Sequence, residues 1–283
     1  MSKNIWNTDL SGKVVVITGA GGIICSNFAK VVARAGAKVA LLDRNRERSQ
    51  AFAEEINAKG GIAKSFVCDV LNKQSCIEIA EQVKEALGGC DILINGAGGN
   101  NPNATTDSEY FESEGIDAQT KSFFSLTEEG IRQVLDLNFM GTLIPTQVFA
   151  QQMIGKSGCC ILNISSMNAY RPLTKIPAYS GAKAAVSNFT QWLAVYFSRM
   201  GIRVNAIAPG FFSTAQNAKL LWNEDGSPTE RTKKIFAATP MGRFGECDEL
   251  EGSLLFLIDD KASGFITGVV IPVDGGFSAY SGV

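Results

Sequence analysis

The sequence predicts an α/β protein with a single Rossmann-type, doubly wound parallel sheet and helices on both faces. Short β-branched runs alternate with helical patterns along the 283 residues, as in sheets built from βαβ units. Glycine-rich turns follow the first and fourth of these runs, and ligands of such sheets bind at the carboxyl ends of the strands. No repeat, low-complexity segment or linker divides the chain, so we expect one domain over residues 1–283.

The first unit resembles the opening of a nucleotide-binding βαβ motif. Lys13–Thr18 is β-branched, Gly19–Gly22 is a glycine turn, and Ile23–Ala35 has a helical pattern. Glycines let the backbone approach a phosphate, and the helix N-terminus supplies N–H donors to it. We therefore expect a dinucleotide at this turn.

The end of the second strand indicates which dinucleotide binds. Lys38–Leu42 is an apolar run that ends in Asp43. A carboxylate there can accept hydrogen bonds from both ribose hydroxyls and repels a 2′-phosphate, which favours NAD over NADP. Arg44 favours NADP instead, because an arginine at this position can pair with the 2′-phosphate.

The alternation then continues to the end of the chain. Further strands are predicted at Ala63–Val70, Asp91–Ile94, Cys159–Ile164, Arg203–Ala208 and Gly268–Val273. Further helices are predicted at Arg46–Lys59, Lys73–Leu87, Ile131–Gln152, Tyr179–Met200 and Leu250–Leu257. Residues 100–130 and 211–240 interrupt the pattern and exceed the usual βα connection of about 2–6 residues. We interpret them as loops over the substrate mouth, with a merely solvated excursion as the alternative.

The candidate chemistry lies in residues 165–183. Tyr179 and Lys183 are four apart on a predicted helix and so share a face. A nearby ammonium is expected to lower the pKa of the phenol. Ser166, at the end of the preceding strand, could bond the same substrate oxygen. The chain has no histidine, so acid–base work at a carbonyl or alcohol would fall to this group; two surface residues on a helix are the alternative.

Composition argues against several partners. A net charge of −2 gives no reason to expect nucleic acid or an anionic membrane. Met1–Leu10 lacks the layout of a signal peptide, and no apolar run approaches about 18 residues. The seven cysteines have no zinc-type spacing, so we expect reduced packing residues, no metal and a cytoplasmic protein.

Taken together, short motifs resemble those of the short-chain dehydrogenase/reductase family over Leu10 to Phe277. They are T-G-x-x-x at Thr18–Gly22, Asp43, C-D-V with Asp69, N-G-A-G at Asn95–Gly98, Asn138, I-S-S at Ile164–Ser166, Y-x-x-x-K at Tyr179–Lys183, P-G-x-x-x-T at Pro209–Thr214, and the closing V-D-G-G. The resemblance implies that Tyr179 is the acid/base, Lys183 lowers its pKa and holds the nicotinamide ribose, Ser166 positions the carbonyl, and Asn138 keeps a water in a proton relay.

The resemblance also implies a set of NAD-binding residues. They are Gly19, Gly22, Ile23, Ile24, Asp43, Asp69, Val70, Asn95, Ala97, Gly98, Tyr179, Lys183, Pro209, Gly210, Phe212 and Thr214. Asp69 would meet the adenine amino group, Asn95 the adenosine side and Thr214 the carboxamide. One departure stands out, because Ile23 and Cys25 occupy the positions of the last two family glycines. Ile23 is expected to crowd the pyrophosphate unless Gly22 takes over.

A narrower similarity indicates the substrate. The stretches G-G-N-N-P-N-A-T-T, S-M-N-A-Y-R-P-L-T-K-I-P-A-Y-S and L-L-W-N-E-D-G are similar to those of the short-chain branch of D-mannonate oxidoreductases. That branch interconverts a keto-hexuronate and a hexonate (D-fructuronate and D-mannonate) with NAD.

The substrate-binding candidates follow from that chemistry. Asn100, Asn101, Asn103 and Asn168 offer paired donors and acceptors for sugar hydroxyls. Arg171 is the first candidate for the carboxylate, because an arginine fork matches its two oxygens, and Lys175 and Arg243 come next. The alternatives are another polyol, gluconate-type or 3-oxoacyl enzyme of the family, or a catalytically silent NAD-binding protein. The family resemblance further implies a homotetramer, with the helices predicted over residues 131–152 and 179–200 at one interface.

Overall fold

Seven parallel strands form one sheet in the computed structural model, which describes residues 8–112, 120–214 and 218–282. In sheet order the strands are β3 (Ile62–Val67), β2 (Lys38–Asp43), β1 (Val14–Thr18), β4 (Ile92–Asn95), β5 (Cys159–Ile164), β6 (Ile202–Pro209) and β7 (Val270–Val273). The strand order reverses between β1 and β4, and this reversal opens a crevice at their carboxyl ends. The predicted fold class is confirmed.

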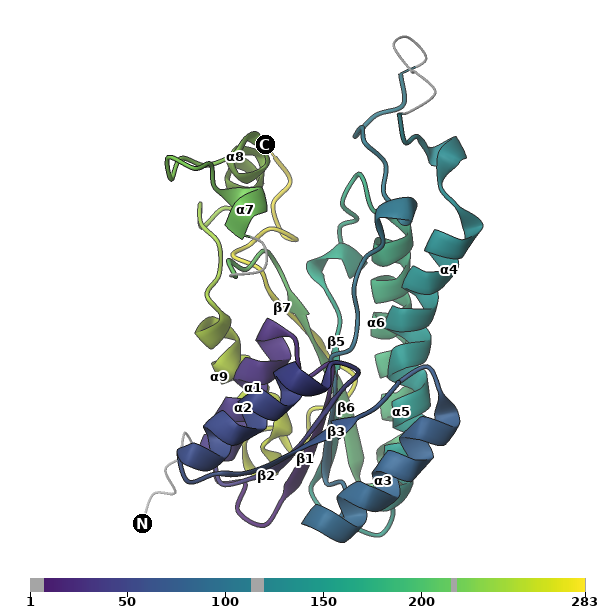
Figure 1. Ribbon diagram of the computed structural model, residues 1–283, viewed down its shortest axis with the longest axis vertical. Helices are drawn as coiled ribbons and strands as arrows, with labels where there is room; N and C mark the ends of the chain where they lie inside the picture. Colours follow the sequence, from purple (N-terminus) through teal and green to yellow (C-terminus); the bar gives the residue numbers. More distant parts are fainter. Residues whose placement is uncertain (1–7, 113–119, 215–217, 283) are drawn as a thin grey trace.

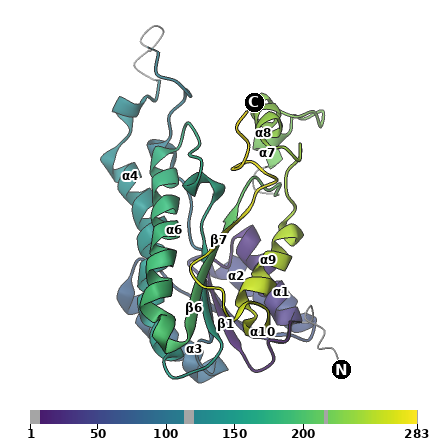
Figure 2. The same cartoon turned by 180° about the vertical axis from the view of Figure 1, so that it is seen from behind.

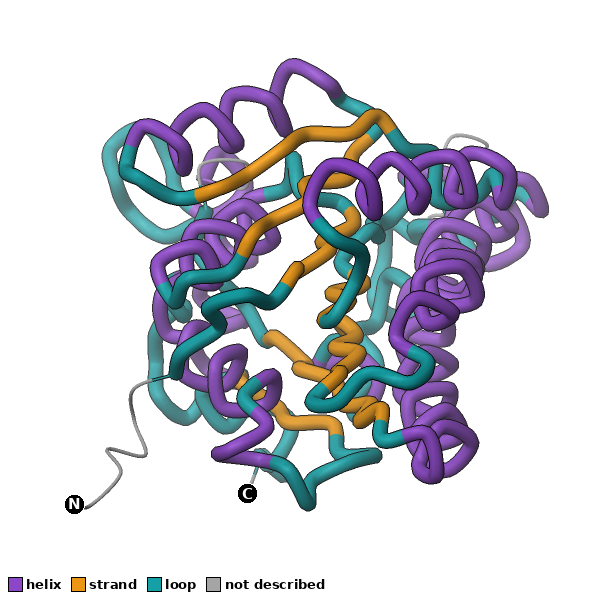
Figure 3. Tube along the Cα trace, turned by 90° about the horizontal axis from the view of Figure 1, so that it is seen from below, coloured by secondary structure: helices purple, strands orange, loops and turns teal. Residues whose placement is uncertain are grey.

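Each face of the sheet carries its own core because successive strand residues point to opposite faces. Val15 and Ile17 pack on one side, and Val14 and Val16 on the other. The first core is covered by α1 (Ile23–Arg34), α2 (Arg46–Ala58) and α9 (Glu251–Ile258). The second is covered by α3 (Lys73–Leu87), α5 (Gly141–Phe149) and α6 (Pro177–Phe197). Figures 1 and 3 show the sheet held between these two layers.

The third strand is shorter than predicted. It ends at Val67, whereas the sequence pattern extended it to Val70. The Asp69 carboxylate accepts a hydrogen bond from the backbone N–H of Leu71 at 3.0 Å, which turns the chain away from the sheet. Asp69 therefore lies in a turn, two residues beyond the strand.

The helix predicted over residues 131–152 is divided. α4 (Glu128–Leu135) runs into a π-helical turn at Asp136–Met140, which continues into α5 and a last 3₁₀ turn at Ala150–Met153. Asn138 lies in the π turn, and its Nδ2 donates to the carbonyls of Val134 and Gly99, both at 2.7 Å. Single π turns in α-helices are frequent at functional sites.

The two long segments are partly ordered by short elements. Residues 100–130 contain 3₁₀ turns at Pro102–Ala104 and Phe123–Ser125. Residues 211–240 contain α7 (Ala218–Leu221) and α8 (Glu230–Ala238), which the sequence pattern missed. The segments meet where Lys234 pairs with Glu109 at 2.7 Å. Among the described residues, no helix is long and apolar enough to span a bilayer.

Candidate active site

Two glycine turns face each other across the crevice. Gly19 has φ +65°, and a Cβ built there would lie 2.8 Å from the backbone of Ala97. The Thr18 hydroxyl accepts hydrogen bonds from the backbone N–H groups of Gly96 at 3.1 Å and Ala97 at 3.3 Å. The β1 and β4 turns are thus tied together at a spacing that a side chain at Gly19 would prevent.

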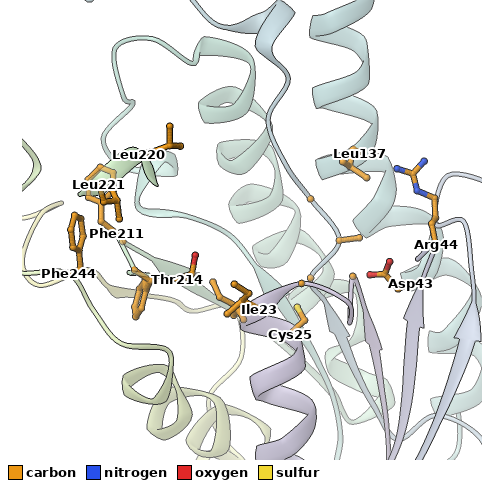
Figure 4. A pocket seen from close by; sticks show the side chains of 18 of the residues that line it. Ile23, Cys25, Asp43, Arg44, Leu137, Phe211, Thr214, Leu220, Leu221 and Phe244 are labelled. Carbon is orange, nitrogen blue, oxygen red and sulfur yellow. The ribbon is translucent and has the colours of Figure 1, made fainter. Parts of the chain in front are cut away.

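A cavity of about 540 Å³ runs along this crevice. Asp43 and Arg44 lie at one end, and Leu220, Leu221 and Phe244 at the other (Figure 4). Of the residues predicted to bind the cofactor, the following line it: Gly19, Gly22, Ile23, Ile24, Asp43, Val70, Ala97, Gly98, Gly210, Phe212 and Thr214. The long shape between two glycine turns suits an extended dinucleotide.

Five residues predicted to bind the cofactor lie outside this lining: Tyr179 and Lys183, whose contacts are given below, and Asp69, Asn95 and Pro209. The Asp69 side chain bonds its own turn, as described above. Asn95 is buried and donates to Thr146 and Asn163, both at 2.9 Å. Pro209 is the last residue of β6, and the following residue, Gly210, lines the cavity. Direct cofactor contact by these three side chains stays a prediction.

The Asp43 carboxylate is held at the cavity wall. Its Oδ2 accepts a hydrogen bond from the Gly21 N–H at 2.8 Å, and its Oδ1 from the Asn45 N–H at 2.7 Å. A Cβ at Gly21 would come within 3.0 Å of that carboxyl group. The carboxylate is thus fixed beside the glycine turn, where a ribose would lie.

Cys25, which occupies the position of a family glycine, packs against a glycine of the opposite turn. A Cβ built at Gly96 would lie 2.1 Å from the Cys25 Sγ, far inside any tolerable contact. The thiol thus occupies the space that a side chain at position 96 would need. Ile23 lines the cavity beside it (Figure 4). The sequence pattern drew attention to position 25 but gave no sign of this pairing.

The side chains of the catalytic candidates come together at the start of α6. Lys183 is buried, its Nζ donates to the Ile164 carbonyl at 2.8 Å, and it lies 5.7 Å from the centre of the Tyr179 ring. Ser166 is buried at the end of β5 and hydrogen-bonds the Tyr179 hydroxyl. Its neighbour Ser165 instead bonds Ser187 at 2.7 Å, which leaves Ser166 as the serine that faces the phenol.

The pKa values correct one expectation. Burial raises the pKa of the Tyr179 phenol, and the hydrogen bond with Ser166 opposes that rise. Burial lowers the pKa of Lys183 from 10.5 to about 8. The expected lowering of the phenol pKa was therefore wrong in direction, because burial of the phenol outweighs the opposing hydrogen bond with Ser166.

Asn138 and Lys183 converge on one glycine of the β4 turn. A Cβ at Gly98 would lie 2.6 Å from the Asn138 Oδ1 and 3.2 Å from the Lys183 Nζ. The same Oδ1 accepts a hydrogen bond from the Gly99 N–H at 3.2 Å. The π turn of Asn138, the β4 turn and α6 are thus joined where Gly98 lines the cavity.

The predicted substrate residues differ in their surroundings. The Asn100 Nδ2 donates to Thr105 at 2.9 Å, and the Asn101 Nδ2 donates to Gln133 at 2.5 Å, so both amides are engaged within their loop. Asn168 is buried, and its Oδ1 has no hydrogen-bond partner among the described residues. A buried acceptor of this kind requires a hydrogen-bond donor that the described residues do not supply.

Arg171 is held by the C-terminal segment. Its Nη1 donates to the carbonyls of Phe277, at 3.2 Å, and Tyr280, and its guanidinium lies 5.5 Å from the centre of the Phe277 ring. Its role in binding a substrate stays a prediction, and the structure gives it a different set of contacts.

Several cavity residues were missed by sequence reasoning. They are Leu137, Phe211, Leu220, Leu221, Arg231 and Phe244. Most come from the segment of α7 and α8 or from the π turn. The apolar L-L-W stretch at residues 220–222 was the one local signal of a covering element there.

Comparisons with known proteins agree with this geometry. Residues 13–225 match the family model for short chain dehydrogenases. An uncharacterized oxidoreductase of Haemophilus influenzae is 58% identical over 98% of this chain and 97% of its own. The uncharacterized oxidoreductase UxuB of Bacillus subtilis is 50% identical over 97% of this chain and 98% of its own.

A solved structure is similar over the same length. It is a Haemophilus protein provisionally assigned as a D-mannonate oxidoreductase, with NAD bound. The TM-score is 0.95 at 57% identity, and the match covers 99% of this chain and 100% of that one.

Proposed function

The chain belongs to the short-chain dehydrogenase family, whose members are oxidoreductases, and from that premise we propose that it interconverts a keto-hexuronate and a hexonate with NAD. The observation that carries the proposal is the meeting of Tyr179, Ser166 and Lys183 behind Gly98, a residue that lines the dinucleotide-shaped crevice. The sugar-acid substrate is supported by the similarity to the Haemophilus protein assigned as a D-mannonate oxidoreductase.

The residues of the crevice fit NAD. Gly19, Gly96 and Gly98 line the crevice as bare backbone, because a side chain at any of the three would collide with the protein packed behind it. The N-terminus of α1 faces these glycines and can hold a pyrophosphate. The fixed carboxylate of Asp43 would bind the ribose hydroxyls and disfavour a 2′-phosphate. When bound, the nicotinamide supplies or accepts the hydride.

The protein's own groups would manage the proton. In the reducing direction the Tyr179 hydroxyl donates a proton to the substrate oxygen, and the Ser166 hydroxyl stabilises the charge that develops there. The raised pKa of Tyr179 keeps it protonated and ready to donate at neutral pH. The Lys183 ammonium, held by the Ile164 carbonyl, would orient the ribose and favour proton return to the phenol. The free Oδ1 of Asn168 would accept a sugar hydroxyl.

A turnover screen tests the proposal. NADH and NADPH oxidation are followed with D-fructuronate, and NAD reduction with D-mannonate, D-gluconate, an uncharged hexitol and a 3-hydroxyacyl thioester. We expect the D-fructuronate/D-mannonate pair with NAD(H) to give the highest kcat/KM. Faster turnover of the hexitol or the thioester would replace the proposed substrate, and a preference for NADPH would overturn the role of Asp43. NADH binding without turnover of any substrate would indicate a silent NAD-binding protein.

Tyr179→Phe separates the acid from the rest of the site. The substitution removes the transferable proton and leaves the ring in place, so kcat should fall by about 10²–10⁴-fold. The Kd for NADH, measured by fluorescence titration, should stay within about twofold of wild type by the same reasoning. Retention of more than about a tenth of the activity would mean that another group supplies the proton.

A further inference from the structure

A hexonate substrate brings a carboxylate that has to be paired once water is excluded. The three cations that the sequence suggested for it are already engaged. Arg171 is bound to C-terminal carbonyls, and Lys175 donates to the Asp107 carbonyl at 2.5 Å. Arg243 makes a two-pronged pair with Glu249 at 2.6 and 2.7 Å. Recruiting any of them would break an existing contact.

Arg231 is different. It lines the cavity from α8, and it forms no hydrogen bond or ion pair with any described residue. Residues four apart on a helix share a face, so Arg231 lies one turn before Ile235, which is buried in the cluster beneath α8. Arg231 itself is exposed to solvent at the edge of the cavity, and no described residue gives its guanidinium a partner.

The surroundings of Arg231 suit a charged ligand. α8 packs on α7, and the adjoining end of the cavity is formed by Leu220, Leu221 and Phe244. An apolar wall lowers the local dielectric and strengthens a charge pair that forms beside it. Arg44, the other arginine of the cavity, lies at the opposite end beside Asp43 (Figure 4).

We propose that Arg231 is the anion-binding residue of the cavity, and that its ligand is the substrate carboxylate. This rests on the proposed function. A guanidinium fork matches the two oxygens of a carboxylate, and it also matches the pyrophosphate of a dinucleotide. The carboxylate is favoured because the glycine turn and the N-terminus of α1 already offer donors to a pyrophosphate, whereas nothing else at the α7–α8 end carries an unpaired positive charge among the described cavity residues.

The test compares Arg231→Gln and Arg231→Lys with wild type in two assays. Steady-state kinetics use D-mannonate and an uncharged hexitol, and fluorescence titration measures the Kd for NADH. Arg231→Gln should raise KM for D-mannonate by about 10- to 100-fold, the range for loss of a charged hydrogen bond. KM for the hexitol and the Kd for NADH should be unchanged. Arg231→Lys keeps the charge but loses the two-pronged guanidinium, so its KM for D-mannonate should lie between those of wild type and Arg231→Gln.

Lys233→Gln is the matched control. It removes the same charge from the same helix, but Lys233 pairs with Glu230 at 2.7 Å and does not line the cavity. If Lys233→Gln raises KM for D-mannonate as much as Arg231→Gln does, the effect comes from the change in net charge, and the proposal is overturned.

The remaining outcomes are also decisive. If Arg231→Gln weakens NADH binding alone, Arg231 binds the pyrophosphate, and the proposal that it binds the substrate carboxylate is overturned. If neither KM nor the Kd for NADH changes, the proposal that Arg231 binds an anion is overturned. The proposed function fails separately, because it is contradicted if the wild-type enzyme prefers the hexitol to D-mannonate, whatever the variants do.

Discussion

Cys25 and Gly96 share one space at the base of the cofactor crevice. The Sγ lies 2.1 Å from where a Cβ at position 96 would be. Gly96→Ala should therefore overpack the two turns, destabilise the protein by about 1–3 kcal/mol and weaken NADH binding. Urea unfolding and NADH titration measure the two effects.

Cys25→Gly should rescue that variant. If the two residues compete for one space, the double variant recovers stability and NADH affinity lost in Gly96→Ala, and the double-mutant cycle gives a coupling energy of at least about 1 kcal/mol. Additive losses would show that position 96 is constrained by something other than the thiol.

Burial of Lys183 makes the stability of the protein depend on pH. Burial lowers its pKa from 10.5 to about 8, so between these values the unfolded chain holds a proton that the folded chain has released. Stability conferred by this residue therefore rises with pH across the window. Relative to Lys183→Met, wild type should gain about 3 kcal/mol in free energy of unfolding between pH 7 and 10.5. Denaturant unfolding at a series of pH values checks this.

The difference between the two proteins isolates this one group, since Cys25, the thiol that interacts with its charge, has its pKa raised to about 12 by burial and stays protonated across the window. A difference that stays constant from pH 7 to 10.5 would mean that Lys183 keeps an ordinary pKa in the folded protein. The burial argument for the catalytic cluster would then fail.

At the scale of elements, the segment after β4 is seated on the first turn of α4. The Thr127 N–H donates to the Asn103 carbonyl at 3.1 Å, and a Cβ at Gly130 would lie 2.9 Å from Asn103. Gly130→Ala should push this segment away from α4 and raise KM for the sugar acid several-fold while leaving the Kd for NADH unchanged. Steady-state kinetics and NADH titration measure both.

Gly181→Ala is the control for that substitution. Gly181 lies within α6, and a Cβ there meets nothing within 4 Å. Alanine is the better helix former, so this variant should keep its kinetics and gain about 0.5–1 kcal/mol of stability. Unchanged kinetics in Gly130→Ala would show that the seating of residues 101–104 does not shape the substrate site.

At the scale of the whole molecule, one face of α6 is an aromatic surface that no described element covers. Trp192 stacks on Tyr196 at 4.8 Å, and these side chains are 56% and 65% exposed, with Val195 77% exposed beside them. Figure 2 shows α6 running along the outside of the fold. An exposed patch of this kind indicates an interface, which agrees with the homotetramer we propose.

Trp192→Ser should dissociate the assembly, because it removes the central ring of that surface. Light scattering coupled to size exclusion should show a smaller mass than for wild type. Val67→Ser, which changes an exposed residue of β3 at the far edge of the sheet, should leave the mass unchanged. A monomeric wild type would contradict the homotetramer directly.

The sequence predicted the elements best where a local period decides them. The strands at residues 14–18, 38–43 and 159–164 lie where the β-branched and apolar runs placed them, and α3 has the predicted bounds Lys73–Leu87. Prediction failed in the polar segments and at the π turn. α7 has only four residues, and α8 begins with the charged stretch E-R-T-K-K, so neither shows a clear apolar period. The π turn depends on the Asn138 amide reaching the carbonyl of Gly99, far away in the sequence.

By itself the sequence determined the doubly wound fold, the dinucleotide crevice and the serine, tyrosine and lysine beside it, because these depend on spacing within strands, turns and one helix. Only the tertiary structure decided what those groups experience. It paired Cys25 with Gly96, reversed the expected pKa shift of Tyr179, engaged Arg171 with the C-terminal segment and left Arg231 without a partner among the described residues. Burial and contact between distant residues set each of these properties, and neither quantity exists until the chain has folded.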